Sequence, residues 1–559
     1  MKHIVSILFI TLLLTGCSKD EKEVIRTDFE GNNHIVSFIV TAADGTAYHA
    51  DIADDKIVLE VPEGANLQEA TAKYTISENG TLQPDPKTIT DWTQQYRFLA
   101  TSYSLKDRVY TYTVSYIESQ IPQNVTLATQ EEVNTFGKSG VEVVTGNLTI
   151  GRSSSIEPIT DLSALSKLKI VRGELIFQQS FKGELLDGLS SLEYVGGLSI
   201  SQSKLDEQPK ATLVDIYLPS LKTVNGDFRA ESAILENVNL PELTTISGNL
   251  VVRSAKLIYF KAEKLAFVKD IRLSGSDYSG FNLIKSPLRE LALPTLKKCN
   301  ELFLEEWYLL KLVDLPELTE LRTLNPYECG YVESLHVPKL ERALSINLEG
   351  FYSDGTAFPG SYLPRMVEVS FPSLKYVAGE MRLPSGFDIV DVMYDFPALT
   401  AVEGRLIVGE KFSFPLLQEV GKNHVESDND GYKTLYVSYN KNKNLAFPSL
   451  KKVYGSALLS TLLPNVEAVS LPELLSVEKT LYISRGVGGN GHFFNTSLTE
   501  ILAPKLTSVG KLFISENSLL DDFSTFATLV PHLTPDQWEV TYCLYNPTYE
   551  DVVAGRYKP

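Results

Sequence analysis

The chain has 559 residues, of which 43% are hydrophobic, and its formal net charge is −19 at pH 7. This length and apolar content predict a large buried core divided over more than one domain. The negative charge argues against nucleic acid and anionic lipid as partners, because both are bound by faces rich in lysine and arginine.

The chain begins with an export signal. Lys2 precedes an apolar run of about eleven residues, Ile4 to Leu14, which is too short to span a bilayer as a helix. The sequence Leu14-Thr15-Gly16-Cys17 resembles the lipobox of bacterial lipoproteins, and this resemblance implies cleavage before Cys17 and acylation of that cysteine. We expect residues 1–16 to be a lipoprotein signal peptide and residues 17–33 an acylated flexible linker. The alternative is an ordinary signal peptide with a chance cysteine.

A charged segment follows the cysteine. Ser18-Lys19-Asp20-Glu21-Lys22-Glu23 resembles the export signal of Bacteroidetes surface lipoproteins. That resemblance implies a location on the outer membrane, facing outward, with the lipid anchor as the sole membrane attachment. A solvated linker rich in charge is the alternative. No later segment of the sequence reaches membrane-spanning length.

Residues 34–119 predict a small β-domain. Short apolar runs alternate with turn signals, and residues 109–116 alternate strictly, as a half-buried strand does. Several strands at this spacing predict an immunoglobulin-like sandwich. The order of Trp92, Tyr96 and the run from Tyr110 to Val114 resembles an Ig-like domain of unknown function found near the N-termini of Bacteroidetes lipoproteins. We expect the domain to be a spacer, with Trp92 as a packing residue.

Residues 120–518 carry a repeated phrase of an apolar residue, proline, any residue and leucine. Pro219 and Pro241 are 22 residues apart, as are Pro294 and Pro316. An apolar residue, mostly branched, stands five positions after each proline, often with a glycine two positions later and then a short strand. The branched residues include Val224, Ile246, Val377, Val402, Val420, Val453, Val477 and Val509.

This period predicts a solenoid. A unit of about 22 residues cannot bury its apolar face alone, whereas stacked units form a continuous core. We expect leucine and valine ladders to point inward, proline to stand where the chain bends, and glycine to make a tight turn before each strand. The fold class is therefore mainly β, with a small Ig-like sandwich followed by a leucine-rich-repeat or β-helix-like solenoid.

The opening of the repeats supports this assignment. Residues 127–137 and the sequence Gly146-Asn147-Leu148-Thr149-Ile150-Gly151 resemble the start of receptor L domains, which are leucine-rich β-helical modules. The resemblance implies a right-handed solenoid, with a parallel sheet along one face and binding as the typical role. The chain lacks the cysteine-rich disulfides of the receptor modules, so their choice of ligand does not carry over. We expect residues 519–559 to form a C-terminal cap, with a helix over Leu519 to Leu533 and Trp538 packed inside.

The remaining cysteines and histidines indicate no metal or cofactor. Cys299, Cys329 and Cys543 match no zinc spacing, and we interpret them as buried small apolar residues. A Cys299–Cys329 disulfide is the alternative. Residues 428–431 resemble the start of a calcium loop but lack its closing glutamate, which favours a solvated loop.

The strongest candidates for ligand contact are aromatic. Aromatic side chains of the central repeats could stack on sugars or anchor a protein partner, or they could pack beneath insertions. The candidates are Trp307, Tyr308, Tyr327, Tyr331, Tyr436 and Tyr439. The middle residue of each short strand should also face outward, either covered by loops or available for contact. These residues are Ile176, Arg229, Val251, Arg382, Ile407, Tyr482 and Phe513.

Three functions remain open from the sequence. The first is a surface-exposed binding or adhesion module that recognises a protein through the solenoid. The alternative is a carbohydrate-binding accessory protein of a glycan uptake system. A catalytic solenoid resembling pectin lyases would need clustered Asp, Lys or Arg in register, and the sequence shows no such cluster, so we expect no enzyme activity. We expect a monomer without a cofactor.

Overall fold

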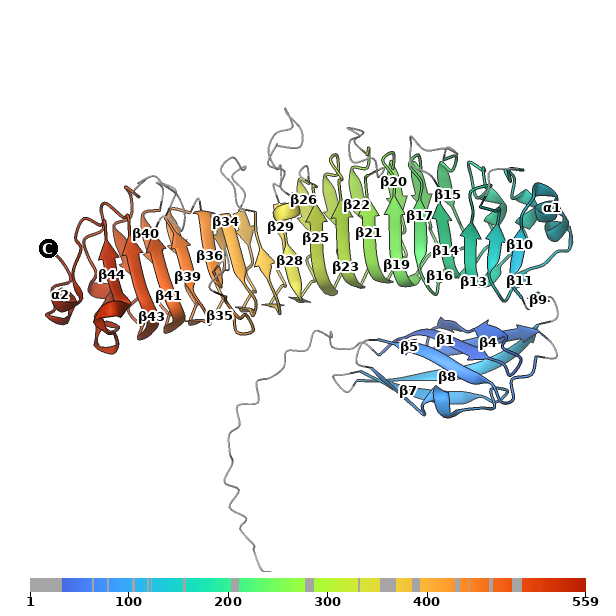
Figure 1. The fold of residues 1–559 in the computed structure, drawn as a ribbon, viewed down its shortest axis with the longest axis horizontal. Coiled ribbons are helices and arrows are strands. Elements are labelled where there is room, and N and C mark those ends of the chain that lie inside the picture. Colours follow the sequence, from blue (N-terminus) through green and yellow to red (C-terminus); the bar gives the residue numbers. More distant parts are fainter. Residues whose placement is uncertain are drawn as a thin grey trace, which may run out of the picture.

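The computed structural model describes residues 33–62, 65–77, 80–102, 106–117, 120–121, 123–153, 157–202, 211–276, 286–329, 332–351, 368–384, 393–427, 433–440, 442–461, 466–484 and 495–559. The fold is mainly β, as predicted, with a small N-terminal domain beside a long stack of parallel strands (Figure 1). Cys17, Tyr331 and residues 428–431 lie outside the described residues.

Two sheets form the N-terminal domain. The first has the order β2-β1-β5 and is antiparallel, and the second has the order β3-β4-β8-β7-β6 with a parallel pair between β4 and β8. The elements are β1 (Ile35–Thr41), β2 (Ala47–His49), β3 (Asp51–Ala53), β4 (Lys56–Pro62), β5 (Thr71–Ile76), β6 (Thr81–Gln83), η1 (Pro86–Thr88), β7 (Tyr96–Thr101) and β8 (Asp107–Ile117).

Aromatic rings fill the core between these sheets. Trp92 is fully buried, and its ring centroid lies 5.4 Å from that of Phe38 and 5.1 Å from that of Tyr112. The Trp92 indole donates to the Ile89 carbonyl at 3.0 Å. Trp92 is therefore a packing residue, as the sequence predicted.

The repeats build one long sheet in which nearly every pair of neighbouring strands is parallel. Its strands are β9 (Gln120–Ile121), β10 (Val125–Leu127), β11 (Val143–Val144), β12 (Leu148–Ile150), β13 (Ile170–Phe177), β14 (Tyr194–Ser201), β16 (Thr223–Val224), β17 (Phe228–Glu231), β19 (Thr245–Arg253), β21 (Phe267–Ser274), β23 (Lys298–Glu305), β25 (Glu320–Tyr327), β27 (Arg342–Ala343), β28 (Ser345–Asn347), β30 (Tyr376–Val377), β31 (Met381–Arg382), β33 (Ala401–Val402), β34 (Leu406–Ser413), β35 (Glu419–Val420), β36 (Leu435–Asn440), β38 (Lys452–Val453), β39 (Ala457–Ser460), β41 (Ser476–Ser484), β43 (Ser508–Ser515) and β44 (Trp538–Thr541).

Short parallel strands form a second series. They are β15 (Asp215–Tyr217), β18 (Asn237–Asn239), β20 (Tyr259–Lys261), β22 (Glu290–Ala292), β24 (Leu312–Asp314), β26 (Ser334–His336), β29 (Glu368–Ser370), β32 (Met393–Asp395), β37 (Asn444–Ala446), β40 (Ala468–Ser470) and β42 (Glu500–Leu502). The helical elements of the repeat region are α1 (Gln130–Lys138), η2 (Ser163–Leu165), η3 (Asp187–Leu189), η4 (Glu349–Phe351), η5 (Ser524–Phe526), η6 (Val530–His532), η7 (Pro535–Gln537) and α2 (Tyr549–Val553).

One hydrophobic cluster runs through the whole repeat region, from Leu127 to Val552. Its members stand in register from repeat to repeat: Val224 lies beside Ile246, and Val453 lies beside Val477. The branched residues predicted to point inward are all buried. Cys299, Cys329 and Cys543 are buried free thiols, so the disulfide alternative is wrong.

The recurring glycines have a different role from the predicted tight turn. A Cβ on Gly248 would lie 2.6 Å from the carbonyl carbon of Gly226 in the preceding repeat. Real Cβ atoms do not approach backbone that closely. Glycine is therefore needed at this position because the backbones of adjacent repeats nearly touch.

The two ends of the stack are covered differently (Figure 1). Helix α1 begins at a capping box between Thr129 and Glu132 and buries Val133 in the core. At the other end Trp538 packs on Phe526, with ring centroids 6.2 Å apart. The predicted helix over Leu519 to Leu533 is wrong, because this segment holds only the short turns η5 and η6, and β44 adds a further strand to the long sheet.

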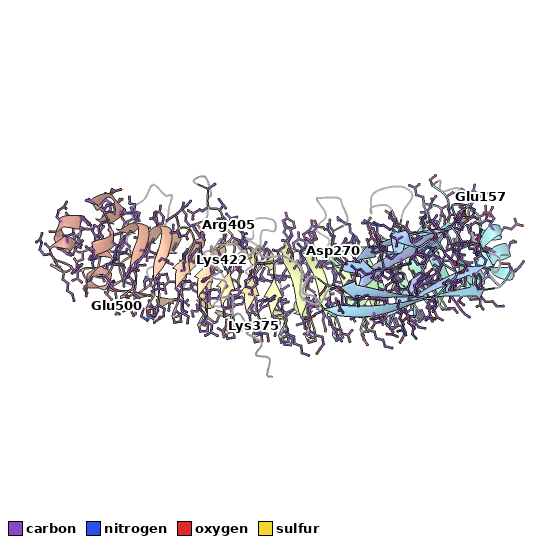
Figure 2. The ribbon with its side chains drawn as sticks, turned by 90° about the horizontal axis from the view of Figure 1, so that it is seen from below. Glu157, Asp270, Lys375, Arg405, Lys422 and Glu500 are labelled. Carbon is purple, nitrogen blue, oxygen red and sulfur yellow. The ribbon has the colours of Figure 1, made fainter. Side chains whose placement is uncertain are left out.

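The N-terminal domain packs along the lower edge of strands β11 to β23 (Figure 1). Viewed from below in Figure 2, it overlies one half of the stack and leaves the half with Lys375, Arg405 and Lys422 uncovered. Arg172 of β13 is the central contact and is 1% exposed. Its guanidinium lies 2.5 Å from Glu60 and 3.7 Å from Asp51 of the N-terminal domain, and 5.0 Å from the ring centroid of Tyr194.

His34 lies at the same domain contact and makes it sensitive to acid. Burial, followed by the charges of Arg108 and Lys298, lowers the pKa of His34 from 6.5 to about 4, although Asp55 opposes this shift. Between those pH values the unfolded chain takes up a proton that the folded chain does not. Stability contributed at this site is therefore present above pH 6.5 and decreases as the pH falls toward 4.

We expect this loss to disappear when His34 is replaced by glutamine. From pH 7 to pH 4.5, the wild-type N-terminal domain should lose about 1 to 3 kcal/mol more than His34→Gln, because all other titrating groups are shared. Thermal unfolding of both proteins at the two pH values measures the difference, at about 4 to 8 °C per kcal/mol for a domain of this size. If both proteins lose the same stability between the two pH values, the assignment of this pH dependence to His34 is wrong.

Candidate functional site

The outer face of the long sheet carries one continuous column of side chains. In β41, Leu481 and Ile483 are buried in the core, while Tyr482 between them is half-buried and points away from it. Tyr482 stands in register with Leu458 on one side and Phe513 on the other. The same register continues across neighbouring strands, because each strand contributes one outward residue between two inward ones.

The column changes character along the stack. From β14 to β25 it is mostly polar or charged, with Ser199, Arg229, Arg272 and Asn325 interrupted by Val251 and Phe303. From β34 to β43 it is apolar and aromatic. We call this second part the aromatic ladder, which consists of Ile407, Tyr436, Leu458, Tyr482 and Phe513.

Three rings of the ladder are partly exposed. Ile407 and Leu458 are fully buried, yet neither belongs to the core cluster, which places both on the outer face. Tyr436, Tyr482 and Phe513 are half-buried, and the rings of Tyr482 and Phe513 are 5.6 Å apart at a tilt of 57°. With strands about 4.8 Å apart, the rings span roughly 15 Å. The ladder therefore presents a linear row of ring surfaces.

Charged groups stand beside both ends of the ladder. Arg405 lies two residues before Ile407 and contacts Glu380 at 2.7 Å, and Glu380 also pairs with Arg382. Burial raises the pKa of Glu380, but hydrogen bonds and charge from the two arginines outweigh it and lower that pKa overall. At the other end Lys511 lies 2.6 Å from Glu539. These groups can bond to polar atoms of a ligand that lies along the rings.

The predicted contact residues do not gather into one site. Trp307 is fully buried, and its indole donates to the Leu273 carbonyl at 2.9 Å. Tyr308 is 9% exposed and bonds to the Glu328 carboxylate, and burial together with that bond raises the pKa of Tyr308. Tyr327 is 51% exposed at the end of β25. A surface groove displaying Trp307 and Tyr308 is therefore ruled out.

Backbone geometry explains the burial of Trp307. Glu306, the residue directly after β23, has a φ of 58°, and Glu328, directly after β25, has a φ of 53°. After each of these left-handed residues, the next side chain points into the core. It is Trp307 in the first case and Cys329 in the second, and both are buried. Of the predicted contact residues, only Tyr436 lies in the aromatic ladder, whereas Tyr439 lies in β36 and its side chain is outside the described atoms.

Other described surfaces of the stack are less suited to a ligand. Exposed lysines and glutamates of adjacent repeats pair with each other, as in Lys264–Glu242 at 2.7 Å and Lys505–Glu473 at 2.7 Å. Such pairs leave no strong electrostatic field at the surface and contribute little to stability.

Among the described residues, no group of three His, Cys, Asp or Glu side chains is arranged to hold a metal ion. Likewise, no described helix has the length and apolarity needed to cross a membrane.

One comparison with known proteins gives a match. Residues 35–114 match the family model described as SGBP, N-terminal, which covers most of the small β-domain and none of the repeats. No curated protein matches the chain. The match supports the likeness of this segment to domains of Bacteroidetes surface proteins.

Proposed function

We propose that this protein is a surface glycan-binding accessory protein that holds an extended carbohydrate chain along the aromatic ladder. The observation that carries the proposal is the row of partly exposed rings in register, Tyr436, Tyr482 and Phe513. The match of residues 35–114 supports it, because SGBP denotes a glycan-binding surface family. This match favours the glycan hypothesis over general protein adhesion, which the sequence alone put first.

The chemistry of the ladder suits a sugar chain. The faces of pyranose rings carry C–H groups that pack on aromatic rings, while their hydroxyls need hydrogen-bond partners. The ladder supplies the rings, and Arg405 and Lys511 supply donors beside it. Tyr482 and Phe513 lie on adjacent strands, and Tyr436 lies two strands from Tyr482 with buried Leu458 between them. Rings spread over this distance favour a chain of sugars over a single small molecule.

The remaining architecture fits display on a cell surface. We propose that the repeats form a leucine-rich solenoid, that the N-terminal sandwich is immunoglobulin-like, and that acylated Cys17 anchors the protein in the outer membrane. The role is binding without catalysis, with the bound glycan passed to an uptake system. The family match supports the glycan part of this proposal.

Retention of polysaccharides in native affinity gels tests the function. Wild-type protein should be retarded by at least one soluble polysaccharide from a panel of glucans, mannans, galactans and pectins. Each of Tyr482→Ala and Phe513→Ala should weaken retention by about five- to thirty-fold, since a stacked ring contributes about 1 to 2 kcal/mol.

Tyr217→Ala is the matched control, because Tyr217 is 50% exposed on β15, away from the ladder. Its retention should equal that of the wild type. The proposal fails if no polysaccharide in the panel retards the wild type, or if both ladder variants bind as well as the control.

A further inference from the structure

A cleft of about 250 Å³ lies between the N-terminal domain and the long sheet. The N-terminal domain contributes His34, Arg108 and Tyr110 to its wall, and the repeats contribute Ser247, Phe267 and Lys298. Ligand sites are common at domain interfaces, and their walls combine apolar surface with a few polar groups. This cleft has both properties.

Its two sides are held in fixed positions. The imidazole of His34 faces the ring of Phe267, with centroids 6.2 Å apart. The His34 N–H donates to the Ser77 hydroxyl at 3.0 Å, and the His34 carbonyl accepts from the Ser77 amide at 2.8 Å and from the Ser77 hydroxyl at 3.0 Å. Phe267 belongs to β21 and stands in register with Lys298 of β23. The walls therefore stand on strands of both domains, with Arg108 and Tyr110 in β8 and His34 directly before β1.

The charges in the cleft compensate each other. Arg108 pairs with Asp55 at 2.7 Å and donates to the Asn33 side chain at 3.2 Å. Lys298 pairs with Glu320 at 2.6 Å. A site built for an anion or a cation would leave an excess of one charge facing the ligand. Asp54 and Lys297 also line the cleft and add one charge of each sign, so the charged lining residues together with Glu320 carry no excess, which favours a neutral ligand.

The hydrogen-bonding groups suit hydroxyls. His34 is neutral at physiological pH because its pKa is about 4, so one ring nitrogen donates and the other accepts. The Ser247 hydroxyl can also donate or accept. A sugar hydroxyl has the same double capacity. The half-buried ring of Phe267 provides the apolar surface that the C–H face of a sugar needs.

We propose that this cleft binds one neutral sugar residue and forms a second glycan site, distinct from the aromatic ladder. The inference deepens the proposed function and rests on it. Because the site uses walls from both domains, an occupied cleft stabilises the docked arrangement of the N-terminal domain. The cleft therefore couples sugar binding to the position of the N-terminal domain on the repeat stack.

Methyl glycosides of glucose, galactose, mannose and xylose are the probes, since each presents one neutral sugar ring. Saturation-transfer NMR on the full chain should detect binding of at least one of them at millimolar concentration. The same glycoside should raise the unfolding temperature of the N-terminal domain. Phe267→Leu, which removes the ring but keeps an apolar side chain, should weaken binding about five-fold or more, and His34→Gln should weaken it as well.

Tyr217→Ala is the matched control, because Tyr217 is exposed on β15 and lies outside both the cleft and the ladder, and it should bind the glycoside as the wild type does. Loss of glycoside binding in Tyr482→Ala, with binding kept in Phe267→Leu and His34→Gln, would overturn the cleft as the site. Absence of binding by any of the four glycosides would also overturn it. Retention of polysaccharides by the wild type would, in that case, leave the ladder function standing, so the two failures can be told apart.

Discussion

Replacing Arg172 with methionine should release the N-terminal domain from the repeat stack. The guanidinium is 1% exposed and faces two carboxylates of the other domain, Glu60 and Asp51. Methionine keeps the volume but leaves both carboxylates without their cation. Breaking a buried ion pair in this way costs about 3 to 5 kcal/mol. Because the side chains of Asp51 and Glu60 are 37% and 25% exposed, we expect the loss to be about 2 to 4 kcal/mol.

Small-angle scattering measures the release directly. A freed N-terminal domain should raise the radius of gyration and make the junction near β9 more sensitive to protease. Lys222→Met is the matched control, because Lys222 forms an exposed pair with Glu193 at 2.7 Å and should change neither property. An unchanged scattering profile for Arg172→Met would show that the Arg172 ion pairs are not needed to hold the domains together.

A cycle with Glu60→Gln identifies the partner. Glutamine still accepts a hydrogen bond from Arg172 but removes the charge, so this variant alone should have a smaller effect. Added to Arg172→Met, it should cost little more, since the carboxylate it removes has already lost its partner. Additive effects would mean that the 2.5 Å contact carries no coupling.

The repeats could be predicted because their signal is local and periodic. Pro-x-Leu at a spacing of 22 residues identified the inward positions, and Cys299 was assigned correctly because it occupies the slot of a branched apolar residue. Alternation within strands also placed Ile407, Tyr482 and Phe513 on the outer face. Leu458 was missed because Ala457-Leu458-Leu459 is apolar throughout, so no alternation shows which side chain faces out.

The burial of Trp307 and the contact made by Arg172 depend on geometry that could not be predicted from the sequence. Trp307 follows Glu306, whose positive φ turns the chain inward, and glutamate gives no signal for that conformation. Arg172 stands within a repeat strand, and its partners lie over a hundred residues earlier in the chain. Contacts between domains need both surfaces in place. Neither the contact of Arg172 with the N-terminal domain nor the cleft beside Phe267 could therefore be predicted from one segment of the sequence alone.

Leu481→Ala should destabilise the repeat region by about 2 to 5 kcal/mol, whereas Tyr482→Ala should cost less than about 1 kcal/mol. Leu481 is fully buried between Ala457 and Leu512 of the adjacent strands, so its truncation leaves a cavity in the continuous core. Tyr482 is the next residue, but it faces outward and is only half-buried.

Urea unfolding followed by circular dichroism compares the two variants in the same strand, which removes differences in backbone environment. We expect a lower urea midpoint for Leu481→Ala alone and weakened polysaccharide retention for Tyr482→Ala alone. That result would show that Leu481 stabilises the fold whereas Tyr482 binds the ligand. If Tyr482→Ala destabilises the protein as much as Leu481→Ala does, the rings of the ladder hold the sheet together. A ring already committed to packing cannot also be the surface on which a sugar stacks.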